Sequence, residues 1–163
     1  TYIDWWFIFA VSPRPVRFVI DNKFYSLPSG KFWFSQAGLI PIATRKESEE
    51  ILTKAFDNIS NSIQSGDCLG LFPEGWITRD GNMKKFQPGI IKIIQRDPVN
   101  IVPISLIGLW GSIFSFEGGR VLFKMPKGFR RKVKIIIGKP ITPSEYNSEK
   151  VRTEILNNLE EKF

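Results

Sequence analysis

Short apolar segments typical of β-strands alternate along this chain with segments of helical periodicity. The clearest helix is predicted over residues 46–64, where apolar residues recur on one face. A buried strand is predicted directly after it, over residues 67–72. Because strands that alternate with helices are typical of layered α/β domains, we expect an α/β fold. We expect a single domain whose mixed, mostly parallel sheet is flanked by helices.

The remaining elements follow the same alternation. Strands are expected over residues 16–20, 39–43, 67–72, 101–107 and 132–137. Helical segments are expected over residues 1–11, 23–37 with an interruption at 28–30, 46–64, 89–95 and 148–163. No repeat, linker or low-complexity segment divides the chain, so we expect one domain over residues 1–163.

The composition is that of a globular domain, with 42% apolar and 24% charged residues. The longest apolar run, residues 5–11, is far shorter than the roughly 20 residues needed to span a bilayer. The single Cys68 cannot form an internal disulfide, and we expect it to be a buried, unreactive thiol. With one Cys and no His the usual zinc-ligand sets are excluded, and we expect neither a metal nor another cofactor.

The absence of His also restricts the chemistry, because His is the side chain whose ordinary pKa best suits proton transfer near neutral pH. Ser-His-Asp and Cys-His catalysis cannot be assembled from these residues alone. The chain starts at Thr1 with neither an initiator Met nor a signal-peptide pattern. We therefore expect it to be an N-terminally truncated piece of a longer protein.

Positive charge is concentrated between Gly118 and Ser144, a stretch with eight basic residues and no acidic one. These residues, called the basic stretch below, are Arg120, Lys124, Lys127, Arg130, Arg131, Lys132, Lys134 and Lys139. Such a stretch can attract anionic lipid headgroups, an acidic protein or nucleic acid, or can be a solvated surface with no partner. Nucleic acid is disfavoured because no nucleic-acid-binding motif accompanies the charge.

Aromatic residues are concentrated at the other end of the chain, where 11 of the 22 lie in the first 34 residues. Phe32, Trp33 and Phe34 form an aromatic triplet directly after Lys31. Rings beside a cation are favoured at a membrane interface, but rings also pack in cores. The triplet is therefore interpreted in two ways, as part of the core or as a membrane contact.

Residues 71–81 form the segment most suited to carry chemistry. A predicted buried strand leads directly into Glu74, Gly75, Arg79 and an Asp-Gly turn. Ligands of α/β sheets bind outside the carboxyl ends of strands, where this segment is expected. Arg79 can bind a phosphate through two parallel hydrogen bonds. The alternative is a plain connecting loop in which Glu74 and Arg79 pair with each other.

The same segment resembles a block of a known family. Phe72 to Gly89 is similar to the pattern F-P-E-G-x-x-x-R-D-G-x-x-x-x-F-x-x-G of the glycerolipid acyltransferases related to 1-acylglycerol-3-phosphate acyltransferase. Residues 102–108 resemble the late V-P-V-x-x-x-G strand of that family, and residues 38–42 with Arg45 resemble its second block. Residues 1–4 look like the end of its first block, H-x-x-x-x-D. The resemblance covers nearly the whole chain.

The resemblance implies an O-acyltransferase that moves a fatty acyl group from acyl-CoA or acyl carrier protein to a lysophospholipid. It assigns catalytic roles to Asp4 and Glu74, and substrate binding to Arg45, Gly75 and Arg79. The catalytic His of the family would stand two positions before Thr1, outside this chain.

Two positions depart from the family pattern, and one alternative role remains open. Ile77 stands where the family usually has an Arg, which leaves Arg79 to bind the phosphate, and Arg45 lies one residue further from Gly38 than is common. Asp4 can also be read as part of a helix cap with Thr1.

The resemblance further implies a location at the cytoplasmic face of a bacterial inner membrane, either as a peripheral protein or as one domain of a membrane protein. An anionic membrane surface would then be a partner, and nucleic acid would not. The competing hypothesis is a catalytically silent module that binds lipid or an acidic partner.

Overall fold

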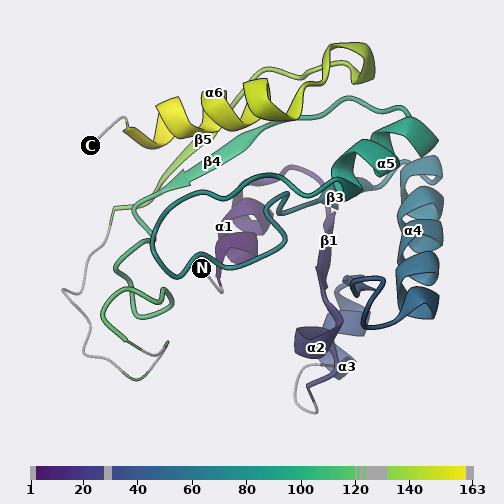
Figure 1. Ribbon diagram of the computed structural model, residues 1–163, viewed down its shortest axis with the longest axis horizontal. Coiled ribbons are helices and arrows are strands. Elements are labelled where there is room, and N and C mark those ends of the chain that lie inside the picture. Colours follow the sequence, from purple (N-terminus) through teal and green to yellow (C-terminus); the bar gives the residue numbers. More distant parts are fainter. Residues whose placement is uncertain (1–2, 28–30, 120, 122, 124–131, 161–163) are drawn as a thin grey trace. The chain divides into compact units, whose positions relative to one another are not determined.

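The structure is a computed structural model that describes residues 3–27, 31–119, 121, 123 and 132–160 (Figure 1). The chain divides into two compact units. The first unit consists of Thr1–Phe7, Pro73–Ile90 and Val99–Phe163, and the second consists of Ile8–Phe72 and Ile91–Pro98. Each unit contains a sheet of its own.

The second unit contains a three-stranded parallel sheet in the order β2-β1-β3. Its strands are β1 (Val16–Asp21), β2 (Ile40–Ile42) and β3 (Cys68–Gly70). Val19 lies opposite Ile40 in one ladder, and Val16 lies opposite Cys68 in the other. Since all three strands run in one direction, their carboxyl ends share one edge of the sheet.

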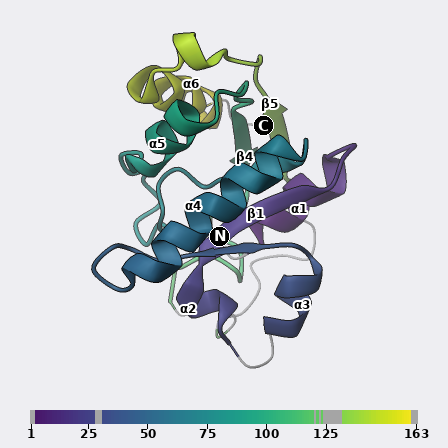
Figure 2. The ribbon, with the colours of Figure 1, turned by 90° about the vertical axis from the view of Figure 1, so that its right-hand side faces the viewer.

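Helix α4 (Glu49–Gln64) packs against this sheet, as Figure 2 shows. It begins where the Ser48 hydroxyl accepts a hydrogen bond from the N–H of Ile51 at 3.2 Å, which satisfies one of the unpaired donors of the first turn. Its apolar face joins the sheet in a core cluster made of Val19, Ile40, Ala55, Ile59 and Ile93. The periodicity that predicts this helix is therefore the periodicity of its buried face.

Three shorter helices precede α4 in the chain. They are α1 (Asp4–Val11), α2 (Asn22–Tyr25) and α3 (Lys31–Gln36). Phe34 of α3 packs against Phe24 and Tyr25, with ring centroids 5.2 and 6.2 Å away. Phe32 and Trp33 are 63% and 69% exposed. Phe34 is thus half-buried against neighbouring rings, and membrane contact stays a prediction for the two exposed rings.

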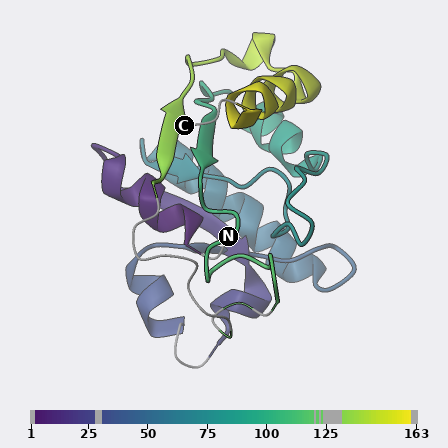
Figure 3. The same cartoon turned by 90° about the vertical axis from the view of Figure 1, so that its left-hand side faces the viewer.

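The first unit contains a two-stranded antiparallel sheet of β4 (Ile104–Ile107) and β5 (Lys134–Ile137). Helix α6 (Ser148–Glu160) packs beside β4, as Figure 3 shows. Asn158 of this helix donates from Nδ2 to the Ser105 hydroxyl of β4 at 3.2 Å. The end of α6 is therefore attached to the sheet by a polar contact as well as by packing.

Two further elements are present in the described chain. Helix α5 (Gly89–Arg96) contributes Ile93 to the core cluster of the second unit. The 3₁₀ turn η1 (Pro143–Glu145) precedes α6, and there the Thr142 hydroxyl donates to Glu145 Oε2 at 2.7 Å. The N–H of Thr142 donates to the same oxygen at 3.4 Å, and this second hydrogen bond belongs to a capping box, which fixes the start of the turn.

The predicted α/β class is confirmed, and every predicted helix and strand has a counterpart near its expected range. Within the described part of the chain, however, the five strands form two sheets, not the single mixed sheet expected. β3 is short, and Pro73 beyond it has no N–H to donate to a further strand. Cys68 is a free thiol that is half-buried, less than expected. The predicted helix break at 28–30 and the end of the last helix at 161–163 lie outside the described residues.

Candidate functional site

The loop predicted to carry chemistry lies in Pro73–Ile90 of the first unit. Gly75 has φ +71° and Gly81 has φ +83°, a left-handed backbone conformation that favours glycine. A Cβ atom on Gly81 would lie 2.8 Å from the Trp110 ring, so the close packing there also requires glycine. Two glycines therefore set the path of the loop on either side of Arg79.

The turn that follows Arg79 is closed by its own side chains. Thr78 Oγ1 donates to Asp80 Oδ1 at 2.8 Å, and the N–H of Asn82 donates to the same oxygen at 3.1 Å. The N–H of Gly81 donates to Thr78 Oγ1 at 3.0 Å. The hydrogen bond from Thr78, followed by that from Asn82, lowers the pKa of Asp80. Asp80 therefore organises the turn.

Glu74 is half-buried near the start of the loop. The N–H of Lys84 donates to Glu74 Oε2 at 2.7 Å, whereas no described residue donates to Oε1. Burial raises the pKa of Glu74 above its ordinary value, and the hydrogen bond from Lys84 opposes this rise. A carboxyl group with one oxygen held and the other available is suited to accept a hydrogen bond from a ligand hydroxyl.

Asp4 belongs to the same unit as Glu74. It is the first residue of α1, and its negative charge is one of the contributions that raise the pKa of Glu74. The structure therefore brings these two predicted catalytic carboxyl groups within electrostatic reach of each other. The alternative role of Asp4, in a cap with Thr1, involves a residue outside the described ones.

Arg79 is exposed and forms no ion pair with Glu74 in the described part of the chain. Its guanidinium carbon lies 5.5 Å from the ring centroid of Phe116, a cation–π distance. The alternative in which Glu74 and Arg79 pair as a plain loop is therefore wrong. The guanidinium group remains accessible to a ligand.

Arg45 lies in the second unit. Its Nε donates to Glu49 Oε1 at 2.9 Å, one helical turn into α4. It lines a groove of about 360 Å³ together with Glu49, Leu52, Thr53, Phe56, Lys92 and Arg96. The three cations of this groove outnumber its one carboxylate, Glu49, which favours an anionic ligand. The apolar side chains of the groove come from α4.

Lys92 and Arg96 are groove residues that the sequence analysis missed. They stand four residues apart on α5, and this spacing places both on one face of a helix. That spacing was a partial signal, because Lys92 lies within the helix predicted over 89–95 and Arg96 lies one residue beyond it. The groove itself was not predictable, since it also needs residues of α4 from a distant part of the chain.

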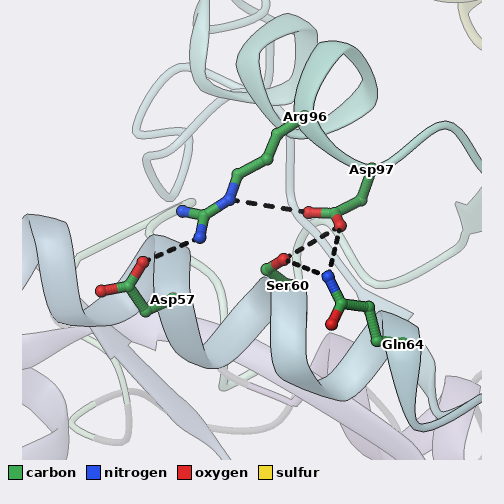
Figure 4. Close-up of polar contacts among 5 residues, drawn as sticks. All are labelled: Asp57, Ser60, Gln64, Arg96 and Asp97. Atoms are coloured by element: carbon green, nitrogen blue, oxygen red, sulfur yellow. Dashed lines mark hydrogen bonds and ion pairs between the residues drawn. The ribbon is translucent and has the colours of Figure 1, made fainter.

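A polar cluster joins the end of α5 to α4 beside this groove (Figure 4). Arg96 Nη2 donates to Asp57 Oδ1 at 2.9 Å. The buried Asp97 accepts at Oδ1 from the Ser60 hydroxyl at 2.9 Å and from Gln64 Nε2 at 3.3 Å. Its other oxygen, Oδ2, is buried without a described hydrogen-bond partner and lies 4.0 Å from Arg96 Nε. The cluster holds Arg96 at the groove.

Three other features considered in the sequence are a metal site, a membrane-spanning helix and the basic stretch. Within the ranges that the structure covers, no group of three metal-ligating side chains gathers. No described helix is long and apolar enough to cross a membrane. Of the basic stretch, Lys132, Lys134 and Lys139 are described, and the other five cations lie outside the described residues.

The comparison with known families decides the classification. The sequence model of the Acyltransferase family matches residues 1–107, more than half of this chain. The chain belongs to the Acyltransferase family. The glycerolipid acyltransferase resemblance, stated from the blocks around Asp4, Arg45 and Glu74, is thereby confirmed.

Curated relatives of this acyltransferase-family chain carry a consistent description. It is 28% identical over 105 residues to a probable 1-acyl-sn-glycerol-3-phosphate acyltransferase of Mycoplasma genitalium, covering 63% of the chain and 38% of that protein. It is 22% identical over 134 residues to the chloroplastic 1-acyl-sn-glycerol-3-phosphate acyltransferase LPAT1 of Arabidopsis thaliana, covering 81% of the chain and 35% of that protein. The chain thus spans little more than a third of the length of these relatives.

The fold of this family member also has a solved counterpart. The crystal structure of the 1-acyl-sn-glycerophosphate acyltransferase PlsC from Thermotoga maritima matches with a TM-score of 0.54 and 17% sequence identity. The match covers 89% of this chain and 54% of that protein. At this identity the likeness shows the fold.

Proposed function

We propose that the protein containing this chain transfers a fatty acyl group from an acyl thioester to the free hydroxyl of a lysophospholipid. The observation that carries the proposal is the loop around Glu74, whose Oε2 is held by Lys84 while Oε1 is left for a ligand. Membership of the Acyltransferase family supports the reaction type. The descriptions of the relatives as 1-acyl-sn-glycerol-3-phosphate acyltransferases support the acceptor.

In the proposed mechanism a His two positions before Thr1 is the general base. It takes the proton from the acceptor hydroxyl, and the oxygen attacks the thioester carbonyl carbon. The new ester C–O bond forms, the C–S bond breaks, and the imidazolium returns the proton to the departing thiolate. Asp4 orients the imidazole and stabilises its charged form. General base catalysis of this kind contributes about 10² to 10⁴ in rate.

The acceptor is held by groups of the loop around Glu74. Glu74 Oε1 accepts a hydrogen bond from an acceptor hydroxyl, and Gly75 allows the backbone to approach the ligand closely. Arg79 neutralises the phosphate, and Arg45 is proposed separately to bind an anionic group in its own groove. This positioning supplies rate by holding the attacking oxygen near the thioester.

The proposed location is the cytoplasmic face of a bacterial inner membrane, with an anionic membrane surface as partner. The exposed rings of Phe32 and Trp33 provide apolar area for partial insertion. The basic stretch provides attraction to anionic headgroups, at about 1 kcal/mol for each cation near the surface before screening. The competing function, a silent lipid-binding or acidic-partner-binding module, uses the same surfaces without a base.

The test uses the longer protein with the residues that precede Thr1. Transfer of labelled acyl groups to 1-acylglycerol 3-phosphate is measured with acyl-CoA and, separately, with acyl carrier protein, which distinguishes the two donors. We expect turnover that falls by about 10² to 10⁴ when the His before Asp4 is replaced by Ala. A residue other than His at that position, or full activity of the Ala variant, contradicts the enzyme and favours the silent module.

A further inference from the structure

Arg152 of helix α6 contacts the candidate site from a distant part of the chain. Its Nη2 donates to the carbonyl oxygen of Met83 at 2.8 Å, and its Nε donates to the carbonyl oxygen of Lys84 at 3.1 Å. Arg152 is half-buried, and all three residues belong to the first unit. The guanidinium group therefore binds the carbonyl oxygens of two consecutive residues in the loop that carries Glu74. The ammonium group of a lysine cannot reproduce this planar contact through two donors.

One peptide group links Arg152 to Glu74. The carbonyl of Met83 and the N–H of Lys84 belong to the same peptide unit, and in a trans peptide these two groups point in opposite directions. The carbonyl accepts from Arg152 at 2.8 Å, and the N–H donates to Glu74 Oε2 at 2.7 Å. A cation at the carbonyl polarises the peptide, which strengthens its N–H as a donor. One peptide group thus connects the guanidinium of Arg152 to the carboxylate of Glu74 through two hydrogen bonds.

We propose that Arg152 is a positioning residue for Glu74, whose carboxylate it holds in place through the peptide between Met83 and Lys84. This inference rests on the proposed function, because it takes Glu74 as a group that binds the acceptor. Arg152 itself touches neither substrate nor reacting atoms in this mechanism. Its part is to fix the direction of Glu74 Oε1.

The charges around Glu74 support this part. Burial raises the pKa of Glu74, Asp4 adds to the rise, and both the Lys84 N–H and the charge of Arg152 oppose it. Removing Arg152 takes away a positive charge that lowers the pKa of Glu74. It also weakens the Lys84 N–H as a donor, whose hydrogen bond lowers the same pKa. The pKa of Glu74 then rises further, and its carboxyl group is less fixed in direction.

The experiment compares Arg152→Ala, Arg152→Lys and Arg152→Gln in the longer protein with the residues before Thr1. The matched control is Lys150→Ala, which removes a cation from the same helix while the backbone N–H of residue 150 keeps its hydrogen bond to Asn147. We expect Arg152→Ala to lower kcat/KM for 1-acylglycerol 3-phosphate about 10- to 100-fold, the range of charge-assisted hydrogen bonds. Arg152→Lys should recover part of this loss, and Lys150→Ala should lose less than about twofold.

The same change in a Glu74→Gln background separates positioning from general support of the fold. If Arg152 acts through Glu74, Arg152→Ala causes little further loss once Glu74 is Gln. An equal loss in both backgrounds overturns the positioning role, although the proposed function stands. Full activity of Glu74→Gln alone overturns the assigned role of Glu74, and with it this inference.

Thermal unfolding of each variant accompanies the kinetics. Where Arg152→Ala does not fold, Arg152→Gln is judged by the same two comparisons, because it keeps a neutral N–H donor on a shorter polar side chain. A kcat/KM for Arg152→Ala equal to that of Lys150→Ala, in folded protein, also overturns the proposal.

Discussion

The ring of Phe34 lies 5.2 Å from that of Phe24, centroid to centroid, and this contact turns the third ring of the aromatic triplet inward. Phe32 and Trp33, which pair edge to face at 5.5 Å, stay exposed. The aromatic triplet therefore has one ring packed against its neighbours and two exposed rings, and the two kinds of ring can be tested separately by mutation.

Replacing both Phe32 and Trp33 by Ser should reduce binding to anionic vesicles with little change in the free energy of unfolding, because exposed rings contribute little to the core. Phe34→Ala should instead lower the free energy of unfolding by about 1 to 3 kcal/mol, less than for a fully buried ring. Vesicle sedimentation and urea denaturation measure the two effects. Val99→Ser is the control, since it removes another exposed apolar side chain. Unchanged vesicle binding of the double variant would reject the membrane contact.

Binding to vesicles should also depend on salt. The five undescribed cations of the basic stretch, together with Lys132, Lys134 and Lys139, attract anionic lipid through a field that salt screens. We expect binding to weaken as ionic strength passes about 0.15 M, where the Debye length is about 8 Å. Neutralising Arg130, Arg131 and Lys132 together should weaken it further. Equal binding to neutral and anionic vesicles would direct attention to an acidic acyl carrier protein.

Glu74→Gln should lower kcat/KM for the acceptor about 10- to 100-fold while leaving the protein at least as stable near neutral pH. The pKa of Glu74 is raised in the folded state, so its carboxyl group weakens folding as pH rises through the range above its ordinary value. Gln removes that penalty and still accepts from Lys84. Denaturant unfolding at several pH values tests the sign. A large loss of stability in Glu74→Gln would mean that the carboxylate serves the fold.

Arg79→Ala should raise the KM for a lysophospholipid about tenfold with little effect on unfolding, since Arg79 is exposed and its contact with the half-buried Phe116 is a cation–π contact alone. Phe116→Leu removes the ring but keeps the cation, and it should retain most of the acceptor affinity. Steady-state kinetics at varied acceptor concentration measure both variants. An unchanged KM for Arg79→Ala, with Lys84→Ala severely impaired, would show that the phosphate is bound by a different cation.

In the polar cluster at the end of α5, we expect the buried Asp97 to contribute more to the free energy of unfolding than the exposed Asp57. Asp97→Ala leaves the Ser60 hydroxyl without its acceptor and leaves Gln64 Nε2 with the Ser60 hydroxyl alone, and we expect a loss of about 2 to 4 kcal/mol in the free energy of unfolding. Asp57→Ala breaks an exposed ion pair with Arg96, and we expect a loss below about 1 kcal/mol. Urea denaturation of the two variants ranks them. The reverse order would contradict the importance assigned to burial.

Local patterns predicted the helices and strands well, because each depends on residues close in sequence. α4 was predicted from its apolar face, and Ser48 explains why it starts three residues later than the predicted 46–64. Strand pairing was not predictable to the same degree. Which strands share a sheet depends on hydrogen bonds between distant segments, so five correct strand positions were compatible with one sheet or with two.

The candidate site shows the same division. Glu74, Gly75 and Arg79 were found because they form one short block, whereas the groove cations Lys92 and Arg96 needed the packing of α5 beside α4. Arg152 carried no local signal at all. Arg152 binds two backbone carbonyl oxygens, and every residue has such an oxygen. The side chains at positions 83 and 84 therefore do not indicate the contact.

The separation of Arg152 from the loop that it holds also sets an order of events during translation. Met83 leaves the ribosome 69 residues ahead of Arg152, an interval of about 3 to 14 s at ordinary synthesis rates. Throughout that interval the nascent chain already contains Glu74 and Arg79, yet the guanidinium that binds the loop has not been made. An emerging polypeptide is therefore unable to hold the loop around Glu74 in its final form until helix α6 has been made.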